Sequence, residues 1–338
     1  AYSNHLGSDD MTARIKAAVD HWRVIADMSD EAVCDLIRAD GIDILIDLSG
    51  HTGYNRLAVF AKKPAPIQCT YLGFHCGTGL SAVDYYIIDA EMTKGLENYY
   101  IESIAHIDYA WNMDPRLLPL EARQADPPCS KRGYVTVGSL NNPFKYNEKV
   151  ISVFAEILKL NPTCRLSCRS KAFMDPAVSK SFTAKFEKLG VNPAQIICGG
   201  AMPRDEALAW LASNIDFGLD PFPYGGHTTA LESLSMGVPM LTLWGERVPG
   251  RVCSVFNKRL GLNQWVAKSI SDYIEKASYF IENIDEVRKS RSHLIFNVGG
   301  SLLLNKQDFA RQFGNLLRSM WKLHSNTPNN MAEKRSDV

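Results

Sequence analysis

The 338-residue chain lacks the features that define several classes of protein. It has no charge imbalance, because 37 lysines and arginines face 37 aspartates and glutamates, and a broad basic surface for nucleic acid or anionic membrane is not expected. No apolar run approaches the roughly 20 residues that span a bilayer, and no secretory signal pattern opens the chain. The eight cysteines form no Cys-x-x-Cys pair and no zinc cluster. We therefore expect a cytoplasmic protein with reduced thiols and neither nucleic-acid nor membrane partners.

Two blocks of alternating strand and helix patterns are separated by a segment rich in proline and charge at residues 114–133. Strands that alternate with helices of ten to fifteen residues predict a parallel sheet with helices on both faces. The fold class expected is therefore α/β, with two doubly wound domains of the Rossmann type that face a cleft. The apolar patterns predict strands at residues 42–48, 67–72, 85–88, 104–107, 134–139, 165–168, 195–198, 215–219 and 239–243, and helices at residues 11–22, 29–40, 147–160, 178–189 and 204–212.

The same patterns predict the domain limits. We expect an N-terminal Rossmann-like domain at residues 1–125 and a C-terminal Rossmann-like domain at residues 126–306. An amphipathic helix should follow at residues 307–324, and the polar tail at residues 325–338 should be disordered.

The stretch from Asp220 to Leu243 carries the strongest functional signal. A buried strand leads into Gly225-Gly226, and a helix is expected to open at His227-Thr228-Thr229. The free N–H groups and the positive dipole end of such a helix receive an anion. Glu232 lies about one turn further on, where a carboxylate can bind a diol such as a ribose. A nucleoside diphosphate fits this pattern, and the alternative is an ordinary crossover with a threonine N-cap.

Two more segments follow strands at the same predicted sheet edge. Asn141, Asn142 and Lys145 come after the first strand of the second block, and the lysine can place a positive charge near a phosphate. Negative charge that builds on a departing diphosphate would be stabilised there. Arg204 opens a later helix and is a candidate contact for a phosphate or the nucleoside. The alternatives are a surface lysine in a loop and a solvated arginine.

Glycine-rich loops also follow two strands of the first block. One contains His51, and the other runs from Gly73 to Gly79 and contains His75. Their glycines let the backbone approach a ligand closely, and either histidine is a candidate general base because histidine titrates near neutrality. The sequence does not choose between them, and the alternative favoured for each is an ordinary loop histidine.

At these residues the chain resembles the catalytic region of the O-linked N-acetylglucosamine (O-GlcNAc) transferase family, inverting glycosyltransferases of the GT-B fold. The similarity is greatest to bacterial members that follow tetratricopeptide repeats, and it extends from about residue 1 to residue 323. It is carried in order by residues 43–52, 56–68, 71–74, 84–89, 141–145, 219–229 and 236–240.

The resemblance implies a UDP-sugar donor, UDP-GlcNAc or a relative, held mainly by the second domain. It implies that Lys145 and the helix start at His227, Thr228 and Thr229 hold the diphosphate, with Lys145 and His227 catalytic. Gly226 and Asn142 would lie near the phosphates, Glu232 would take the ribose hydroxyls, and Gly73 and His75 would border the sugar. The resemblance also implies no metal or other cofactor, serine or threonine hydroxyls of proteins as acceptors, and N-terminal tetratricopeptide repeats in the full-length protein.

Two departures from the family pattern bear on activity. Ala207 stands where the family usually has a histidine near the uracil, and the strand and helix that usually open the catalytic region do not precede residue 1. We expect the first sheet to lack a strand and this chain to be inactive by itself. Two alternatives stay open: a related UDP-glucose-dependent protein N-glucosyltransferase, and an inactive nucleotide-sugar-binding or scaffold protein.

Overall fold

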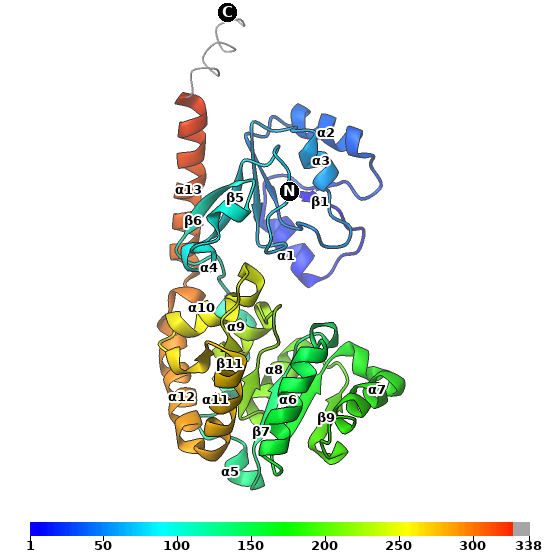
Figure 1. The fold of residues 1–338 in the computed structure, drawn as a ribbon. Coiled ribbons are helices and arrows are strands. Elements are labelled where there is room, and N and C mark those ends of the chain that lie inside the picture. The colour runs from blue at the N-terminus through cyan, green and yellow to red at the C-terminus, as the bar shows by residue number, and fades with distance from the viewer. Residues whose placement is uncertain (327–338) are drawn as a thin grey trace, which may run out of the picture. The chain divides into compact units, whose positions relative to one another are not determined.

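The computed structural model describes residues 1–326, which fold into two compact units (Figure 1). The first unit contains residues 1–111 and the C-terminal helix, and the second contains residues 112–306. All strand pairs in residues 1–326 are parallel. The expected α/β class with two parallel-sheet units is confirmed. Within the described residues, no helix has the length and apolar character needed to span a membrane.

The first unit is built on a four-stranded sheet and a separate pair of short strands. The sheet order is β3-β4-β5-β6, and β1 pairs with β2. Its strands are β1 Tyr2–Ser3, β2 Arg23–Val24, β3 Ile44–Asp47, β4 Ile67–Tyr71, β5 Tyr85–Asp89 and β6 Ser103–Ile107, and its first four helices are α1 Asp10–Ala18, α2 Asp30–Ala39, α3 Leu57–Ala61 and α4 Ala90–Thr93.

Helices cover both faces of this sheet, which explains why β4 is buried along its whole length. Alternate side chains of a strand point to opposite faces. Gln68 points toward α3 and donates from Nε2 to Phe60 O at 2.8 Å. Tyr71 points to the other face, where its ring lies 5.1 Å from that of Phe313 in α13 (Lys306–Asn326). The C-terminal helix therefore forms part of the first unit.

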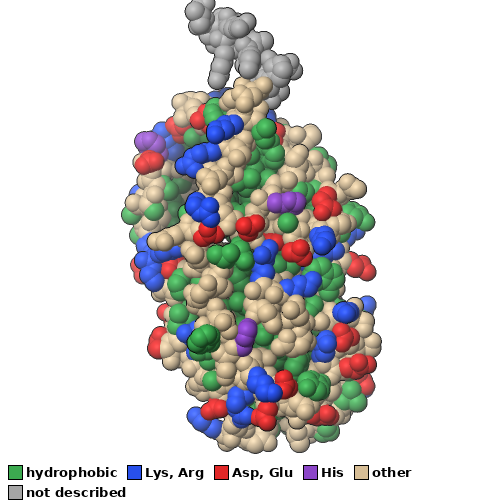
Figure 2. Space-filling model, turned by 90° about the vertical axis from the view of Figure 1, so that its left-hand side faces the viewer, with side chains coloured by type: hydrophobic (Ala, Val, Ile, Leu, Met, Phe, Trp, Pro, Cys, Tyr) green, Lys and Arg blue, Asp and Glu red, His purple; other side chains and the backbone are tan. Residues whose placement is uncertain are grey.

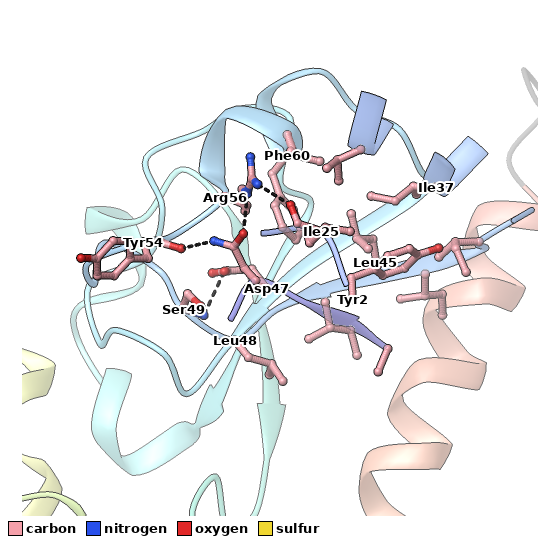
Figure 3. Close-up of a pocket in the computed structure, with 17 residues that line it drawn as sticks. Tyr2, Ile25, Ile37, Leu45, Asp47, Leu48, Ser49, Tyr54, Arg56 and Phe60 are labelled. Carbon is pink, nitrogen blue, oxygen red and sulfur yellow. Dashed lines mark hydrogen bonds between the residues drawn. The ribbon is translucent and has the colours of Figure 1, made fainter. Parts of the chain in front are cut away.

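Arg56, at the start of α3, links this helix to α2 and to the segments that follow β1 and β2. Its guanidinium donates from Nε to Asn4 Oδ1 at 2.9 Å, from Nη1 to Asp30 Oδ1 at 2.7 Å and from Nη2 to Ile25 O at 2.6 Å. Beside it lies a cavity of about 410 Å³ between β1 and β3. Figure 3 shows Arg56, Asp47 and Tyr54 at its polar end and apolar side chains at the other.

The second unit contains a six-stranded sheet in the order β12-β11-β10-β7-β8-β9. The chain enters at β7, moves outward to β8 and β9, and returns to the other side of β7 at β10. The strand order thus reverses between β7 and β10, and ligands of doubly wound sheets bind at the carboxyl ends of the strands at such a point. The strands are β7 Thr136–Ser139, β8 Arg165–Arg169, β9 Ile196–Gly199, β10 Phe217–Leu219, β11 Met240–Leu243 and β12 Val266–Ala267.

The helices predicted at residues 147–160, 178–189 and 204–212 are present as α6, α7 and α8, and each starts within two residues of its predicted position. The helix expected at residues 147–160 is α6, and Asn147 caps it by accepting from Val150 N through Oδ1 at 2.9 Å. The helices are α5 Cys129–Arg132, α6 Glu148–Leu160, α7 Pro176–Glu187, α8 Arg204–Asn214, α9 Thr228–Ser235, α10 Val252–Arg259, α11 Ile270–Glu282 and α12 Ile284–Asn297.

The division of the chain differs from the predicted limits in two places. The boundary expected after residue 125 lies at residue 112, because the proline-rich segment bonds to the second unit. Met113 N donates to Leu303 O at 2.9 Å, and Arg132 Nη1 donates to Asn214 O at 2.9 Å. The tail expected at residues 325–338 begins inside α13, and residues 327–338 lie outside the described part of the chain.

Charged side chains of both signs are interspersed on the face shown in Figure 2. No broad patch of one sign is visible there, in keeping with the equal numbers of acidic and basic residues.

Arg291 should be a main determinant of the stability of the second unit. Its side chain is fully buried and donates to four backbone carbonyls, those of Gln124, Ala212, Ile215 and Asp216. Arg291→Met would leave these acceptors without donors, so we expect the free energy of unfolding to fall by about 3 kcal/mol or more. Urea denaturation measures the loss.

Arg318→Met on the exposed face of α13 is the matched control, and it should change the free energy of unfolding by less than about 0.5 kcal/mol. Equal effects of the two substitutions would contradict the role given to Arg291.

Candidate functional site

The candidate site of the second unit forms where β7 and β10 end side by side. Phe217 is in register with Val137, so both strands deliver their following loops to the same edge of the sheet. The loop after β7 forms a single 3-10 turn at Pro143–Lys145, and the loop after β10 contains the Gly225-Gly226 turn. The sequence prediction that these two loops share an edge is confirmed.

Lys145 joins the two loops. Its ammonium donates to Gly225 O at 2.7 Å and to Asn141 Oδ1 at 3.0 Å, and Nζ lies 4.7 Å from the centre of the Tyr224 ring. Burial lowers the pKa of Lys145, and the nearby charge of Asp220 acts in the opposite direction. The lysine is thus a fixed, half-buried cation and not a solvated surface residue.

Helix α9 begins at Thr228 without a side-chain cap. The first bond of the helix that follows the turn runs from Leu231 N to His227 O at 3.0 Å, so the N–H groups of residues 228–230 precede it. The Thr229 hydroxyl donates to Asn141 Oδ1 at 3.2 Å. The alternative of a threonine N-cap is therefore wrong, and the end of the helix keeps the open N–H groups that bind an anion.

His227 is held as a neutral ring. Its Nε2 lies 3.1 Å from Pro249 O, and because a carbonyl oxygen only accepts, Nε2 carries the proton. Burial lowers the pKa of His227 to about 4, against the opposing effect of the Pro249 carbonyl, and Lys145 lowers it further. In this state the other ring nitrogen is an acceptor, so donation from that nitrogen to a diphosphate would require a different proton placement. The main-chain position of His227 at the helix start matches the prediction.

Glu232 and Arg204 form an ion pair on the edge of the site. Arg204 Nε and Nη2 lie 2.8 and 2.7 Å from Glu232 Oε1, and Arg204 Nη1 also donates to Leu117 O. Burial raises the pKa of Glu232, and Arg204 opposes this shift. Both contacts use Oε1, which leaves Oε2 for another partner. Ala207, where the resemblance leads us to expect a histidine, lies on α8 one turn after Arg204 and is partly buried.

The two asparagines after β7 have different surroundings. Asn141 is 2% exposed and contacts both Lys145 and Thr229. Asn142 is exposed, and its side chain accepts from Phe144 N at 3.1 Å as the cap of the 3-10 turn. The phosphate contact was predicted for Asn142, whereas Asn141 has the contacts to Lys145 and Thr229.

The loop candidates of the first unit also differ from one another. Gly73 is required by close packing, since a Cβ there would overlap the backbone of Leu48 and Ser49. His75 is 5% exposed, and its ring lies 4.4 Å from that of Trp111. His51 is exposed, and its Nε2 lies 3.0 Å from Thr78 O. Of the two candidate bases, only His51 has an accessible ring.

Asp220 and Asn141 are the residues to which the sequence analysis gave no role. Asp220 directly follows β10 and is 1% exposed, and its Oδ1 accepts from Gly226 N at 2.5 Å. The signal that could have identified Asp220 is an aspartate at the end of a buried strand, shortly before two glycines, because a buried carboxylate needs backbone donors.

Comparison with known proteins places the chain in a family. The model of glycosyl transferase family 41 matches residues 2–114 and 132–313. The chain belongs to glycosyltransferase family 41. A tomato (Solanum lycopersicum) relative, named a probable UDP-N-acetylglucosamine–peptide N-acetylglucosaminyltransferase SPINDLY, is 32% identical over 95% of this chain and 35% of its own length. The Arabidopsis thaliana relative named SEC, with the same activity in its name, is 29% identical over 92% of this chain and 32% of its own.

Solved structures agree with this family 41 assignment. A mutant O-GlcNAc transferase of Thermobaculum terrenum matches with a TM-score of 0.89 and 31% identity over 96% of this chain and 61% of its own. Anabaena HepE, solved with UDP and glucose, matches at 0.58 with 12% identity over 91% and 90% of the two chains, which shows the fold alone. The GT-B fold class is thereby confirmed. The chain spans about a third of the length of the curated relatives that it matches.

The described residues contain no candidate metal site. Within residues 1–326, no group of three or more histidine, cysteine, aspartate or glutamate side chains could hold a metal ion. The positive groups at the candidate site are Lys145, the N-terminal end of α9 and, paired with Glu232 at the edge, Arg204.

Gly226 should tolerate no side chain. A Cβ on Gly226 would lie 2.9 Å from Asp220 Oδ1 and 3.1 Å from Thr229 Oγ1. We expect Gly226→Ala to displace the turn and to lower the free energy of unfolding by about 1–3 kcal/mol, measured by urea denaturation.

Gly299→Ala is the matched control, because a Cβ there meets nothing within 4 Å. An unfolding free energy of Gly226→Ala equal to that of the control would show that the turn is not tightly packed.

Proposed function

We propose that this chain is the donor-binding and catalytic region of an inverting glycosyltransferase that moves N-acetylglucosamine from UDP-GlcNAc to serine or threonine hydroxyls of proteins. The observation that carries the proposal is that Lys145 binds the turn that leads into the uncapped start of α9, at the point where the strand order reverses. Family 41 membership and the activity in the relatives' names support the choice of donor and acceptor.

The chemistry follows from where charge develops. The acceptor oxygen attacks the anomeric carbon while the bond from that carbon to the β-phosphate oxygen breaks, and the electron pair leaves with UDP. A base takes the proton of the acceptor hydroxyl. Lys145 and the N–H groups of Thr228 and Thr229 are placed to stabilise the negative charge on the diphosphate, and Glu232 Oε2 to accept from a ribose hydroxyl. These groups supply positive charge without a metal ion, so we propose a metal-independent reaction.

Family membership also suggests a partner segment and a cellular location for the proposed enzyme. We propose that the full-length protein carries tetratricopeptide repeats that present the acceptor. We also propose a cytoplasmic location, which fits the eight cysteines, all of them free thiols in the structure.

Binding of UDP by the whole chain tests the donor site. We expect calorimetric titration to show micromolar affinity, about −8 kcal/mol, and Lys145→Ala and His227→Ala each to weaken it. With UDP-GlcNAc and a protein acceptor, Lys145→Ala should lower the transfer rate by about 10²–10³.

Lys149→Ala on the exposed face of α6 is the matched control and should bind as the wild type does. Titration with UDP-glucose tests the preference for the sugar. Titration with GDP tests the preference for the nucleobase, since Ala207 stands where the family usually has a histidine near the uracil. Transfer of glucose instead of N-acetylglucosamine would favour the glucosyltransferase alternative. Binding without transfer in a longer chain would favour the inactive protein, and no binding by a folded chain would contradict the donor site.

We propose His51, the accessible one of the two loop histidines, as the candidate for the base. We expect His51→Ala to lower kcat for transfer by about 10²-fold while the affinity for UDP stays unchanged. A steady-state assay separates the two effects. His75→Ala should instead lower the melting temperature, because the His75 ring is buried against Trp111.

A further inference from the structure

One peptide group in the glycine turn is held at both ends by charged side chains. The carbonyl oxygen of Gly225 accepts from Lys145 Nζ at 2.7 Å. The N–H of Gly226, which belongs to the same peptide group, donates to Asp220 Oδ1 at 2.5 Å. The ammonium thus faces the negative end of the peptide dipole, and the carboxylate faces the positive end. This arrangement fixes the direction in which the turn leads into α9.

Asp220 has partners from several elements around it. Oδ2 accepts from Thr242 Oγ1 of β11 at 2.9 Å, and the Cys253 thiol of α10 also bonds to the carboxylate. From α11, the Tyr273 hydroxyl donates to the main-chain oxygen of Asp220 at 3.1 Å. The titratable groups that interact with the Asp220 carboxylate are Lys145, Tyr146, Cys253 and Tyr273, and the lysine is the cation among them.

The carboxylate is also packed directly against the turn. A Cβ on Gly225 would lie 2.7 Å from Asp220 Oδ2. Asp220 itself is 1% exposed, so it does not reach a ligand in the site. Any effect of Asp220 on the donor therefore passes through Lys145 and the turn.

We propose that Asp220 is a positioning residue for the donor: its carboxylate holds the Gly225–Gly226 peptide, whose other end binds the ammonium of Lys145, so that Lys145 and the start of α9 face the diphosphate. This role rests on the proposed function and adds to it a buried residue that touches no substrate.

The charge of Asp220 works against stability. Burial raises the pKa of Asp220 to about 6, although the Gly226 N–H, Thr242 and Lys145 all lower it. A carboxyl whose folded-state pKa lies above its unfolded value contributes stability at low pH, and this contribution disappears as the pH rises through about 6. At neutral pH the ionised Asp220 therefore lowers the free energy of unfolding, and replacement by a neutral isostere should not destabilise the protein.

Asp220→Asn tests the role, since an asparagine oxygen can still accept from Gly226 N. We expect calorimetric titration of the whole chain with UDP-GlcNAc to show wild-type affinity rising as the pH increases through about 6 and then levelling. The variant should bind about 10-fold more weakly at pH 7.5, with no such rise. The intact UDP-sugar is used because its diphosphate, esterified at both ends, does not titrate in this range. Urea denaturation at pH 7.5 should show the variant to be at least as stable as the wild type.

Asp216→Asn is the matched control at the opposite end of β10. Its carboxylate is also buried, but it accepts from two backbone N–H groups, those of Cys129 at 2.8 Å and Thr136 at 2.7 Å. The two N–H groups donate to different carboxylate oxygens, and an asparagine has one acceptor oxygen, so one N–H would face the amide nitrogen. This variant should therefore lose stability and keep the pH profile of donor binding.

The outcomes separate the two proposals. Wild-type binding that Lys145→Ala weakens, together with unchanged affinity and pH profile in Asp220→Asn, would overturn the positioning role and leave the donor site intact. Loss of stability in Asp220→Asn at pH 7.5 would assign Asp220 to structure instead. If the folded wild type bound no UDP-GlcNAc at any pH, the proposed function would fail and the role of Asp220 with it.

Discussion

The loops of this protein depend on buried carboxylates that accept hydrogen bonds from backbone N–H groups. Asp47 accepts from Ser49 and Gly50 just after β3, and Glu102 accepts from Thr78 and Gly79. In the second unit Asp216 and Asp220 do the same before and after β10. A loop has no ladder of its own, so its inward-facing N–H groups need such an acceptor when they are buried. These contacts fix the paths of loops that connect rigid strands.

At the donor loop this arrangement brings opposite charges to one peptide group. Lys145 and Asp220 are both buried, which lowers the pKa of Lys145 and raises the pKa of Asp220, so that burial favours the neutral form of each. A fixed cation that costs stability is reasonable if the site binds a diphosphate as proposed, since preorganised charge acts without rearrangement during a reaction. The neutral ring of His227 beside them avoids a second positive charge next to the lysine.

Sequence patterns predicted the parts of the fold that rest on local chemistry. The strand before the glycine turn, the helix capped by Asn147 and the shared edge of the loops at Asn141 and Gly225 follow from apolar spacing, capping residues and the parallel order of strands. The limits of the units were predicted less well. Proline and charge at residues 114–133 are typical of a linker, but this segment bonds to Leu303 and Asn214, which are distant in sequence. No local pattern encodes such partners.

The sequence by itself determined the fold class, the family and the positions of Lys145, His227 and Glu232 on loops and a helix at one sheet edge. Only the tertiary structure decided which groups meet: Asn141 in place of Asn142 beside Lys145, Arg204 on Glu232, and Asp220 beneath the turn. The physical reason is that element type follows from spacing along the chain, whereas the partner and proton state of a side chain depend on burial and on atoms contributed by other elements. The carboxylate of Asp220 is an example, because its surroundings come from β11, α10 and α11 as well as from its own loop.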